Sequence, residues 1–201
     1  MSKRNRDEKT QRILNAARKV FARKGSAATM ADVAAEAGLS QGLAYRYFPS
    51  KDAILTTLVR QIAESGGGPA ARIDGIPGTA GARLHILLSG IIESRREQPE
   101  FYQFLHRVLA DESLPNELRD VVRKNGQVIQ GKIRDLIVEG QAAGEVAKDD
   151  PDQLLAAIMA CLEGMLRRTE LDPKGSIGHF PDARIILRML RPDEEAKASR
   201  P

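Results

Sequence analysis

Cysteine, tryptophan and long apolar runs are scarce or missing in this chain of 201 residues. The single cysteine, Cys161, excludes an intramolecular disulfide and a zinc site built from cysteines. The longest wholly apolar run, residues 154–162, is far too short to span a membrane. The basic N-terminus is not followed by an apolar signal core, which argues against export. We therefore expect a soluble, cytoplasmic protein.

Signatures of catalysis are also missing. The sequence has no glycine-rich phosphate loop, no Ser/His/Asp or Cys/His pattern and no pair of histidines at metal-ligand spacing. Its 3 histidines lie far apart in the sequence. We expect no enzymatic activity, no cofactor and no bound metal.

The basic charge is concentrated at one end of the chain. Residues 1–65 carry 12 Lys and Arg against 6 Asp and Glu, whereas residues 66–201 carry 19 against 21. A basic module joined to a slightly acidic one is the distribution expected of a polyanion-binding domain on a neutral body. A charged surface that merely solvates a helix is the alternative.

Apolar residues recur at helical spacing along the chain, without strand signals or internal repeats, so the fold class is predicted to be all-α with about nine helices. Phe21 and Phe48 are expected to pack together in the core. The expected helices cover residues 7–24, 29–37, 40–47, 51–65, 84–98, 101–110, 115–143, 151–170 and 181–190.

Glycine and proline are concentrated in residues 65–81, which hold 6 glycines and 2 prolines. Such a segment is expected to be a loop or linker and marks the best domain boundary. The predicted organisation is a small domain at 1–50 followed by a connecting helix at 51–65, a linker at 66–81, a larger helical domain at 82–191, and a disordered tail at 192–201.

Residues 29–51 predict two short helices joined by a tight turn. Thr29 is a suitable N-cap, with Asp32 three residues later in an approximate capping box. Gly38 can adopt the left-handed conformation that ends a helix, and Ser40 is suited to cap the next one. This pattern is typical of a helix-turn-helix, whose second helix enters the major groove of DNA.

The second of these helices has side chains suited to DNA. Ser40, Gln41 and Gly42 are small or polar, so they leave base edges accessible, and Gln41 can donate to and accept from adenine. Tyr45 and Tyr47 lie on the same short helix, where their hydroxyls can reach phosphates or bases. Partial burial of the two rings with solvated hydroxyls is the alternative.

The segment Ser40-Gln-Gly-Leu-Ala-Tyr45-Arg-Tyr47-Phe48-Pro-Ser50-Lys51-Asp52 resembles the recognition helix of TetR-family transcriptional regulators. The resemblance covers residues 9–60 and is weaker in the body, where it rests on Gly144-Glu145, the acidic segment at 149–151 and the Leu-Glu-Gly at 162–164. Beside Ser40, it implies DNA contacts at Thr29, Gln41, Gly42, Leu43, Tyr45, Tyr47 and Lys51.

Two residues depart from the family pattern. Leu43 stands where threonine is more usual, which removes a phosphate hydrogen bond and offers an apolar contact, for example to a thymine methyl group. Ala44 replaces a larger aliphatic residue, so the recognition helix is expected to pack closer to the helix that braces it.

Reading a palindrome requires two copies held at a fixed spacing, so the body is expected to form a homodimer. The helix at 151–170 carries one apolar stripe at Leu154, Ile158, Leu162 and Met165 and a second one beside it. Because a helix that is apolar on more than one face must bury both, we predict that the second stripe and the last helix form the dimer interface. The expected interface residues are Leu155, Met159, Leu166, Ile185, Ile186 and Met189. A core confined to one chain is the alternative.

The resemblance also implies a pocket for a small-molecule effector in the body. Its expected lining is apolar with few polar groups, which also describes an ordinary core. The candidate residues are His85, Leu88, Ile92, Phe101, Phe104, Leu105, Ile133, Cys161 and Met165. A buried or surface histidine is the simpler interpretation of His85, and a small apolar residue that of Cys161.

The leading hypothesis is a dimeric repressor that binds a palindromic operator in double-stranded DNA and is released by a small, largely apolar effector. The alternative is a DNA-binding regulator without such an effector, either controlled by a partner protein or acting as an activator. A structural helical protein is disfavoured by the charge distribution and by residues 45–51.

Overall fold

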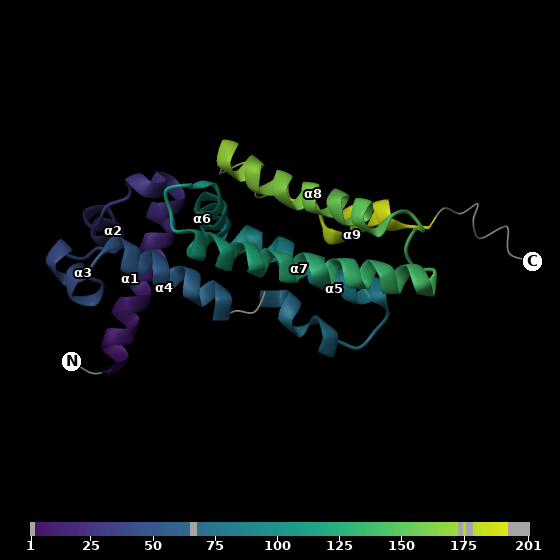
Figure 1. Ribbon diagram of the computed structural model, residues 1–201, viewed down its shortest axis with the longest axis horizontal. Coiled ribbons are helices and arrows are strands. Elements are labelled where there is room, and N and C mark those ends of the chain that lie inside the picture. The colour runs from purple at the N-terminus through teal and green to yellow at the C-terminus, as the bar shows by residue number, and fades with distance from the viewer. Residues whose placement is uncertain (1–2, 65–67, 173–174, 176–178, 193–201) are drawn as a thin grey trace, which may run out of the picture. The chain divides into compact units, whose positions relative to one another are not determined.

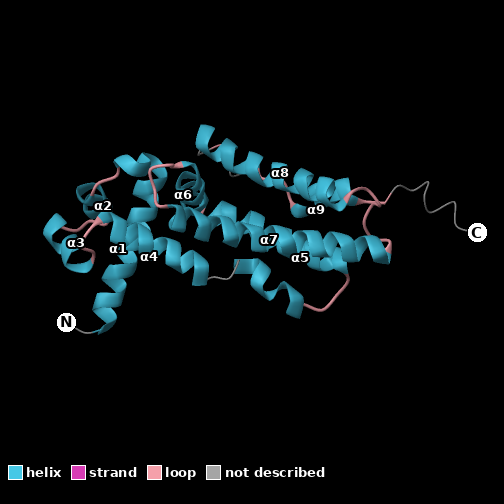
Figure 2. Cartoon of the chain, viewed as in Figure 1, coloured by secondary structure: helices cyan, strands magenta, loops and turns pink. Residues whose placement is uncertain are grey.

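In the computed structural model the protein is helical throughout the residues that the structure describes, which are 3–64, 68–172, 175 and 179–192 (Figures 1 and 2). No strand occurs within these ranges, so the predicted all-α class is confirmed. No helix in the same ranges is long and apolar enough to cross a membrane. The elements are α1 (Lys3–Lys24), η1 (Gly25–Ala27), α2 (Met30–Glu36), α3 (Gln41–Tyr47), α4 (Lys51–Glu64), η2 (Gly68–Gly75), α5 (Ala80–Glu97), α6 (Pro99–Ala110), α7 (Asn116–Ala143), α8 (Pro151–Leu171), α9 (Ala183–Leu187) and η4 (Arg188–Leu190).

The chain divides into two compact units. Unit 1 comprises residues 1–65 and 100–125, and unit 2 comprises residues 66–99 and 126–201. α7 therefore contributes its first turns to unit 1 and the remainder to unit 2.

Unit 1 is organised around α1, whose apolar face is fully buried at Ile13 and Ala17. α6 attaches to α1 through aromatic contacts: the Phe21 and Phe104 rings stack with centroids 6.1 Å apart, and the Arg18 guanidinium lies over the Phe101 ring at 5.7 Å. These contacts bury Phe104 in the core that also holds the helix-turn-helix.

Unit 2 has a separate core formed by η2, α5, the later part of α7, α8 and α9. The predicted stripe of α8 faces this core, since Leu154, Ile158, Leu162 and Met165 are all buried. Two hydrogen bonds hold the loop after α7: the Gly81 amide donates to the side-chain Oε2 of Glu145 at 2.8 Å, and the Ala147 amide donates to the Leu190 carbonyl at 2.8 Å.

The compact units differ from the predicted domain boundaries in two places. Residues 100–125 were expected in the body but pack in unit 1, because Phe104, Val108 and Val122 bury their side chains in its core. Much of the expected linker is the helical turn η2, because Ala70 and Ile73 are buried in the core of unit 2. The expected tail at 192–201 lies outside the described residues except for Pro192.

Candidate nucleic-acid interface

α2 and α3 form a helix-turn-helix closed by a single glycine. Gly38 has φ +61°, a left-handed conformation that side chains with a Cβ rarely adopt. This reversal lets the Leu39 amide donate to the Ala34 carbonyl at 2.9 Å and ends α2. Arg12 of α1 also reaches the turn, with Nη2 3.5 Å from the Gly38 carbonyl oxygen. α3 therefore leaves α2 at a fixed angle (Figure 1).

A complete capping box starts α2, as predicted. The Asp32 amide donates to Thr29 Oγ1 at 3.1 Å, and the Thr29 amide donates to Asp32 Oδ2 at 3.0 Å. Two amides that the helix leaves unpaired are thereby satisfied.

Both acidic residues of α2 are neutralised by the end of α1. Lys24 Nζ lies 2.6 Å from Asp32 Oδ1, and Arg23 Nη2 lies 2.6 Å from Glu36 Oε2. Hydrogen bonds from Lys24, then Thr29, lower the pKa of Asp32 from 3.8 to about 2, and Arg23 lowers the pKa of Glu36. Each carboxylate of α2 thus has a positively charged side chain beside it, which reduces its repulsion of a polyanion.

α3 is anchored on one side and open on the other. Ser40 caps it by accepting the Leu43 amide at 3.2 Å, and Ala44 is completely buried. Gln41, Gly42 and Tyr45 are exposed, the last at 47%. Ala44 lies on the side of α3 that faces the core, and the closer packing expected of this small residue stays a prediction.

The remaining predicted contact residues are partly buried or use their polar groups in hydrogen bonds within the protein. Thr29 and Ser40 are exposed, but their hydroxyls are used in capping. Leu43 is half-buried, as is Tyr47, which packs against the core of unit 1. Lys51 is also half-buried, and its Nζ donates to the Ser26 carbonyl at 2.6 Å.

Arg46 was missed by the sequence analysis. It is exposed and follows Gly42 by four residues, just as Tyr45 follows Gln41 by four, so the four residues form two adjacent rows on α3. The four-residue spacing of Gly42 and Arg46 could be found in the sequence, but of residues 45–47 only the two tyrosines were predicted as contacts. The open surface is therefore polar and basic.

Family models match both parts of the chain. Residues 13–58 match the model described as bacterial regulatory proteins of the tetR family, and residues 104–177 match that of the tetracyclin repressor-like C-terminal domain. The chain belongs to the TetR family. It is a DNA-binding transcriptional regulator of that family, and no enzymatic family is indicated.

Solved structures of this family have the same fold. The MbdR regulator from Azoarcus sp. CIB is 25% identical, with a TM-score of 0.75 over 90% of this chain and 98% of that one. A putative TetR-family regulator from Rhodococcus sp. is 26% identical, with a TM-score of 0.64 over 91% and 98%. A putative regulator from Saccharomonospora viridis in complex with choline is 22% identical, with a TM-score of 0.71 over 91% and 95%.

The expected effector pocket of this TetR-family chain is divided between two cores. Phe101, Phe104 and Leu105 pack in the core of unit 1. Leu88, Ile92, Ile133 and Met165 are buried in the core of unit 2, where Cys161 is half-buried, as is His85 elsewhere in that unit. The predicted lining is divided in this way because α6 packs its aromatic residues on α1.

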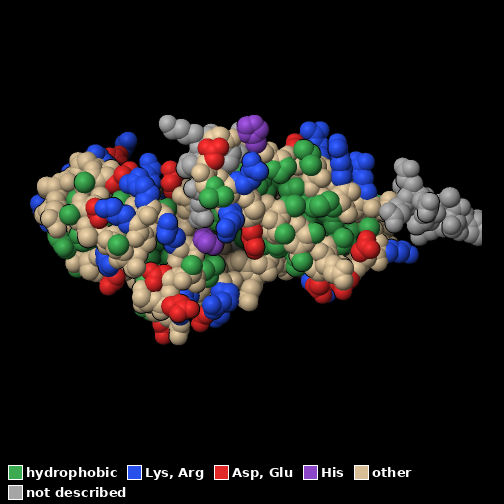
Figure 3. All heavy atoms as spheres, turned by 90° about the horizontal axis from the view of Figure 1, so that it is seen from above, with side chains coloured by type: hydrophobic (Ala, Val, Ile, Leu, Met, Phe, Trp, Pro, Cys, Tyr) green, Lys and Arg blue, Asp and Glu red, His purple; other side chains and the backbone are tan. Residues whose placement is uncertain are grey.

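With one exception, the expected dimer residues are at least partly exposed. Ile185 and Met189 are about half exposed, at 54% and 48%. Leu155, Met159 and Leu166 are half-buried along α8. Ile186 is only 2% exposed because it points into the core of unit 2, so this residue does not belong to the exposed set. Figure 3 shows hydrophobic side chains gathered on the face that carries α8 and α9.

Proposed function

We propose that the protein is a homodimeric repressor that binds a palindromic operator and is released by a small, largely apolar effector. The observation that carries the proposal is the open surface of α3, where Gln41, Gly42, Tyr45 and Arg46 are exposed over a buried Ala44. A recognition helix needs this combination of a small anchored residue and free polar groups.

The exposed residues of α3 suggest distinct roles. Gln41 at the start of the helix can contact an adenine edge, and Gly42 leaves room for close approach of the helix to the groove. Tyr45 and Arg46 can bind phosphates, which position the protein without reading sequence. Thr29, Ser40, Leu43, Tyr47 and Lys51 stay as predicted contacts, with Lys51 required to leave the Ser26 carbonyl to reach a phosphate.

The exposed apolar surface of α8 and α9 supports dimerisation. Ile185, Met189, Leu155, Met159 and Leu166 leave apolar area in water that a second copy would cover. Covering it gives two recognition helices in one assembly, which a palindromic site requires.

DNA binding is tested by selecting duplexes from a random-sequence pool with the full chain. We expect enrichment of a palindrome whose binding weakens steeply as salt rises. Gln41→Ala should lower affinity for the selected site by about 1–3 kcal/mol and relax one position in each half-site. Gln153→Ala, at an exposed glutamine of α8, is the matched control and should bind as the parent does. Failure to enrich any palindrome would overturn the proposal.

Dimerisation is tested by light scattering on size-exclusion eluate. The double substitution Ile185→Glu and Met189→Glu should convert the dimer into a monomer, because two charges would face two others across the interface. Val138→Glu, at a residue of α7 that is 42% exposed, is the control and should stay dimeric. A dimer that survives the double substitution contradicts this interface.

A regulator without a small-molecule effector is the second candidate. It is favoured by the division of the expected pocket lining between two cores. The effector hypothesis is supported by the choline complex of a protein with the same fold. A thermal-shift screen of apolar metabolites against the full chain separates the two: a compound that stabilises the protein and releases operator DNA supports the first candidate, and a screen without one supports the second.

A further inference from the structure

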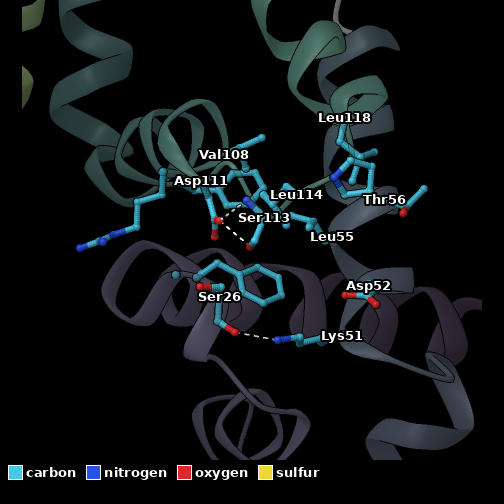
Figure 4. Close-up of a pocket in the computed structure, with 15 residues that line it drawn as sticks. Ser26, Lys51, Asp52, Leu55, Thr56, Val108, Asp111, Ser113, Leu114 and Leu118 are labelled. Atoms are coloured by element: carbon cyan, nitrogen blue, oxygen red, sulfur yellow. Dashed lines mark hydrogen bonds between the residues drawn. The ribbon is translucent and has the colours of Figure 1, made fainter.

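Unit 1 contains a cavity of about 420 Å³ whose lining shares only Phe104 with the predicted effector pocket (Figure 4). Its lining comes from the end of α1, η1, α4, α6, the loop after α6 and the start of α7, and every lining residue lies in unit 1. The volume falls within the range of small-molecule sites, which begin at about 300 Å³. The cavity therefore has the size to hold a ligand.

The deeper wall of the cavity is apolar and tightly held. Phe21, Leu55, Phe104 and Val108 line it and are all buried. An apolar molecule of suitable shape would displace water from these side chains and make dispersion contacts with them.

Polar groups line two sides of the cavity, and Lys51 and Asp111 among them are already hydrogen-bonded. Lys51 Nζ donates to the Ser26 carbonyl at 2.6 Å, and Asp111 Oδ1 accepts the Ser113 hydroxyl at 2.6 Å and the Ser113 amide at 3.0 Å. Figure 4 shows these two hydrogen-bonded groups above and below the same space. Hydrogen bonds from Ser113, and then weaker effects of Ser26 and Lys51, lower the pKa of Asp111.

The charges around the cavity cancel. Lys51 and Arg107 contribute two positive charges, and Asp52 and Asp111 contribute two negative ones. An anionic or a cationic ligand would each meet groups of its own sign as well as of the opposite sign, and it would lose hydration on entering the cavity. A neutral ligand with one hydrogen-bonding group avoids this cost.

We propose that this cavity binds an uncharged, mainly apolar ring compound with one hydroxyl or carbonyl group, and that the DNA-binding unit thereby carries an effector site of its own. The ring would lie against Phe21 and Leu55, and the polar group would hydrogen-bond in the Lys51–Ser26–Asp111 group. This site is separate from any pocket in unit 2.

Occupancy of the cavity would act on DNA binding through Lys51. The Lys51–Ser26 hydrogen bond joins the first residue of α4 to η1, the turn that leads to the Thr29 cap. A ligand oxygen that takes the Lys51 ammonium would withdraw it from phosphate and loosen η1. This effect on DNA rests on the proposed function, whereas ligand binding does not.

The test uses 2-naphthol as the probe, measured by calorimetry on the full chain without DNA. The parent protein should bind it at least about tenfold more tightly than 2-naphthoate or 2-naphthylmethylammonium, its charged analogues. Leu55→Phe, which fills the cavity, should weaken binding by about tenfold or more. Val121→Phe is the control, because Val121 packs on the same core but does not line the cavity, and it should bind within about twofold of the parent.

Thermal unfolding establishes that both variants are folded. If Leu55→Phe does not fold, Ser113→Phe replaces it, since Ser113 is exposed and also lines the cavity. Absence of binding by the parent, equal binding by the filled variant, or a preference for a charged analogue overturns the proposed site.

The proposed effect of the ligand on DNA binding is measured separately, as operator affinity. 2-Naphthol should weaken operator binding by the parent and by Val121→Phe, but not by Leu55→Phe. Binding of the probe without any change in operator affinity overturns the proposed effect on DNA binding. Failure to find an operator is a failure of the proposed function and leaves the calorimetric result unaffected.

Discussion

The two units expose surfaces of opposite kinds. α3 in unit 1 presents polar side chains whose surroundings are fixed by caps, a glycine turn and ion pairs. α8 and α9 in unit 2 present apolar side chains such as Ile185 and Met189. A surface that reads base edges depends on the orientation of single groups, whereas an apolar surface mainly needs area. Small changes in unit 1 should therefore affect function more than similar changes in unit 2.

The largest expected effect tests whether the two cores are independent. Phe104→Ala should reduce stability by about 3–5 kcal/mol, because it removes a ring that is 1% exposed and stacked on Phe21. Hydrogen exchange should accelerate mainly in α1–α4. Ile137→Ala, at a completely buried residue of unit 2, is the counterpart and should cost about 2–5 kcal/mol with faster exchange in α5 and α8. Equal acceleration of both units by either variant contradicts this division.

The next effect separates conformation from contact in unit 1. Gly38→Ala should cost about 1–2 kcal/mol, because Gly38 has φ +61° and an added Cβ would lie 2.6 Å from Arg12 Nη2. Gly42→Ala should instead gain about 0.5–1 kcal/mol, because Gly42 is helical with open space around its Cβ position.

Operator binding distinguishes these glycine variants further. Gly42→Ala should bind DNA more weakly despite its higher stability, because its methyl group occupies the open surface of α3. Chemical denaturation and gel shift measure the two properties. A stable Gly42→Ala protein with unchanged operator affinity would show that this part of α3 does not approach the groove.

The sequence predicted unit 1 in more detail than unit 2, for a physical reason. Thr29, Asp32, Gly38 and Ser40 each follow a local rule that acts within a few residues, and the structure confirms the caps and the turn at these positions. In unit 2 the sequence predicted one helix in this way: Pro151 and helical periodicity indicated the boundaries of α8 and its buried stripe.

The packing partners of α6 could not be predicted from the sequence. Phe101 and Phe104 fit an apolar pocket or a core equally well, and only the fold shows that Phe104 stacks on Phe21, a residue expected to pack on Phe48. Ile186 and Ile185 are likewise adjacent, with the same side chain, yet one is buried and the other is exposed. Their difference depends on the rotation of a short helix, which composition does not determine.

A smaller effect compares the same cap in both units. Thr29→Ala and Thr79→Ala each remove a side chain that accepts the amide three residues later, at the start of α2 and α5 respectively. Both should lower stability by about 1 kcal/mol. Only Thr29→Ala should also weaken operator binding, because α2 braces α3. Urea denaturation and gel shift measure the two effects, and equal loss of affinity in both variants would show that stability alone governs DNA binding.

The smallest expected effect is the response of two carboxylates to acid. Asp32 in unit 1 and Asp182 in unit 2 both have pKa values lowered from 3.8 to about 2, mainly by hydrogen bonds from Lys24 and Arg184. A lowered pKa means that each ionised carboxylate stabilises the folded chain above about pH 4, and that this contribution is lost as the pH falls toward about 2.

Lys24→Met should raise the pKa of Asp32 and leave that of Asp182 unchanged, whereas Arg184→Met should do the reverse. Carboxyl-carbon chemical shifts followed from pH 5 to about pH 2 measure both values. Since Asp182 is exposed to solvent and Asp32 is partly exposed, both pKa shifts should shrink as salt is added. A pKa of Asp32 that changes neither with salt nor in Lys24→Met would show that the hydrogen bonds of the cap alone keep it low.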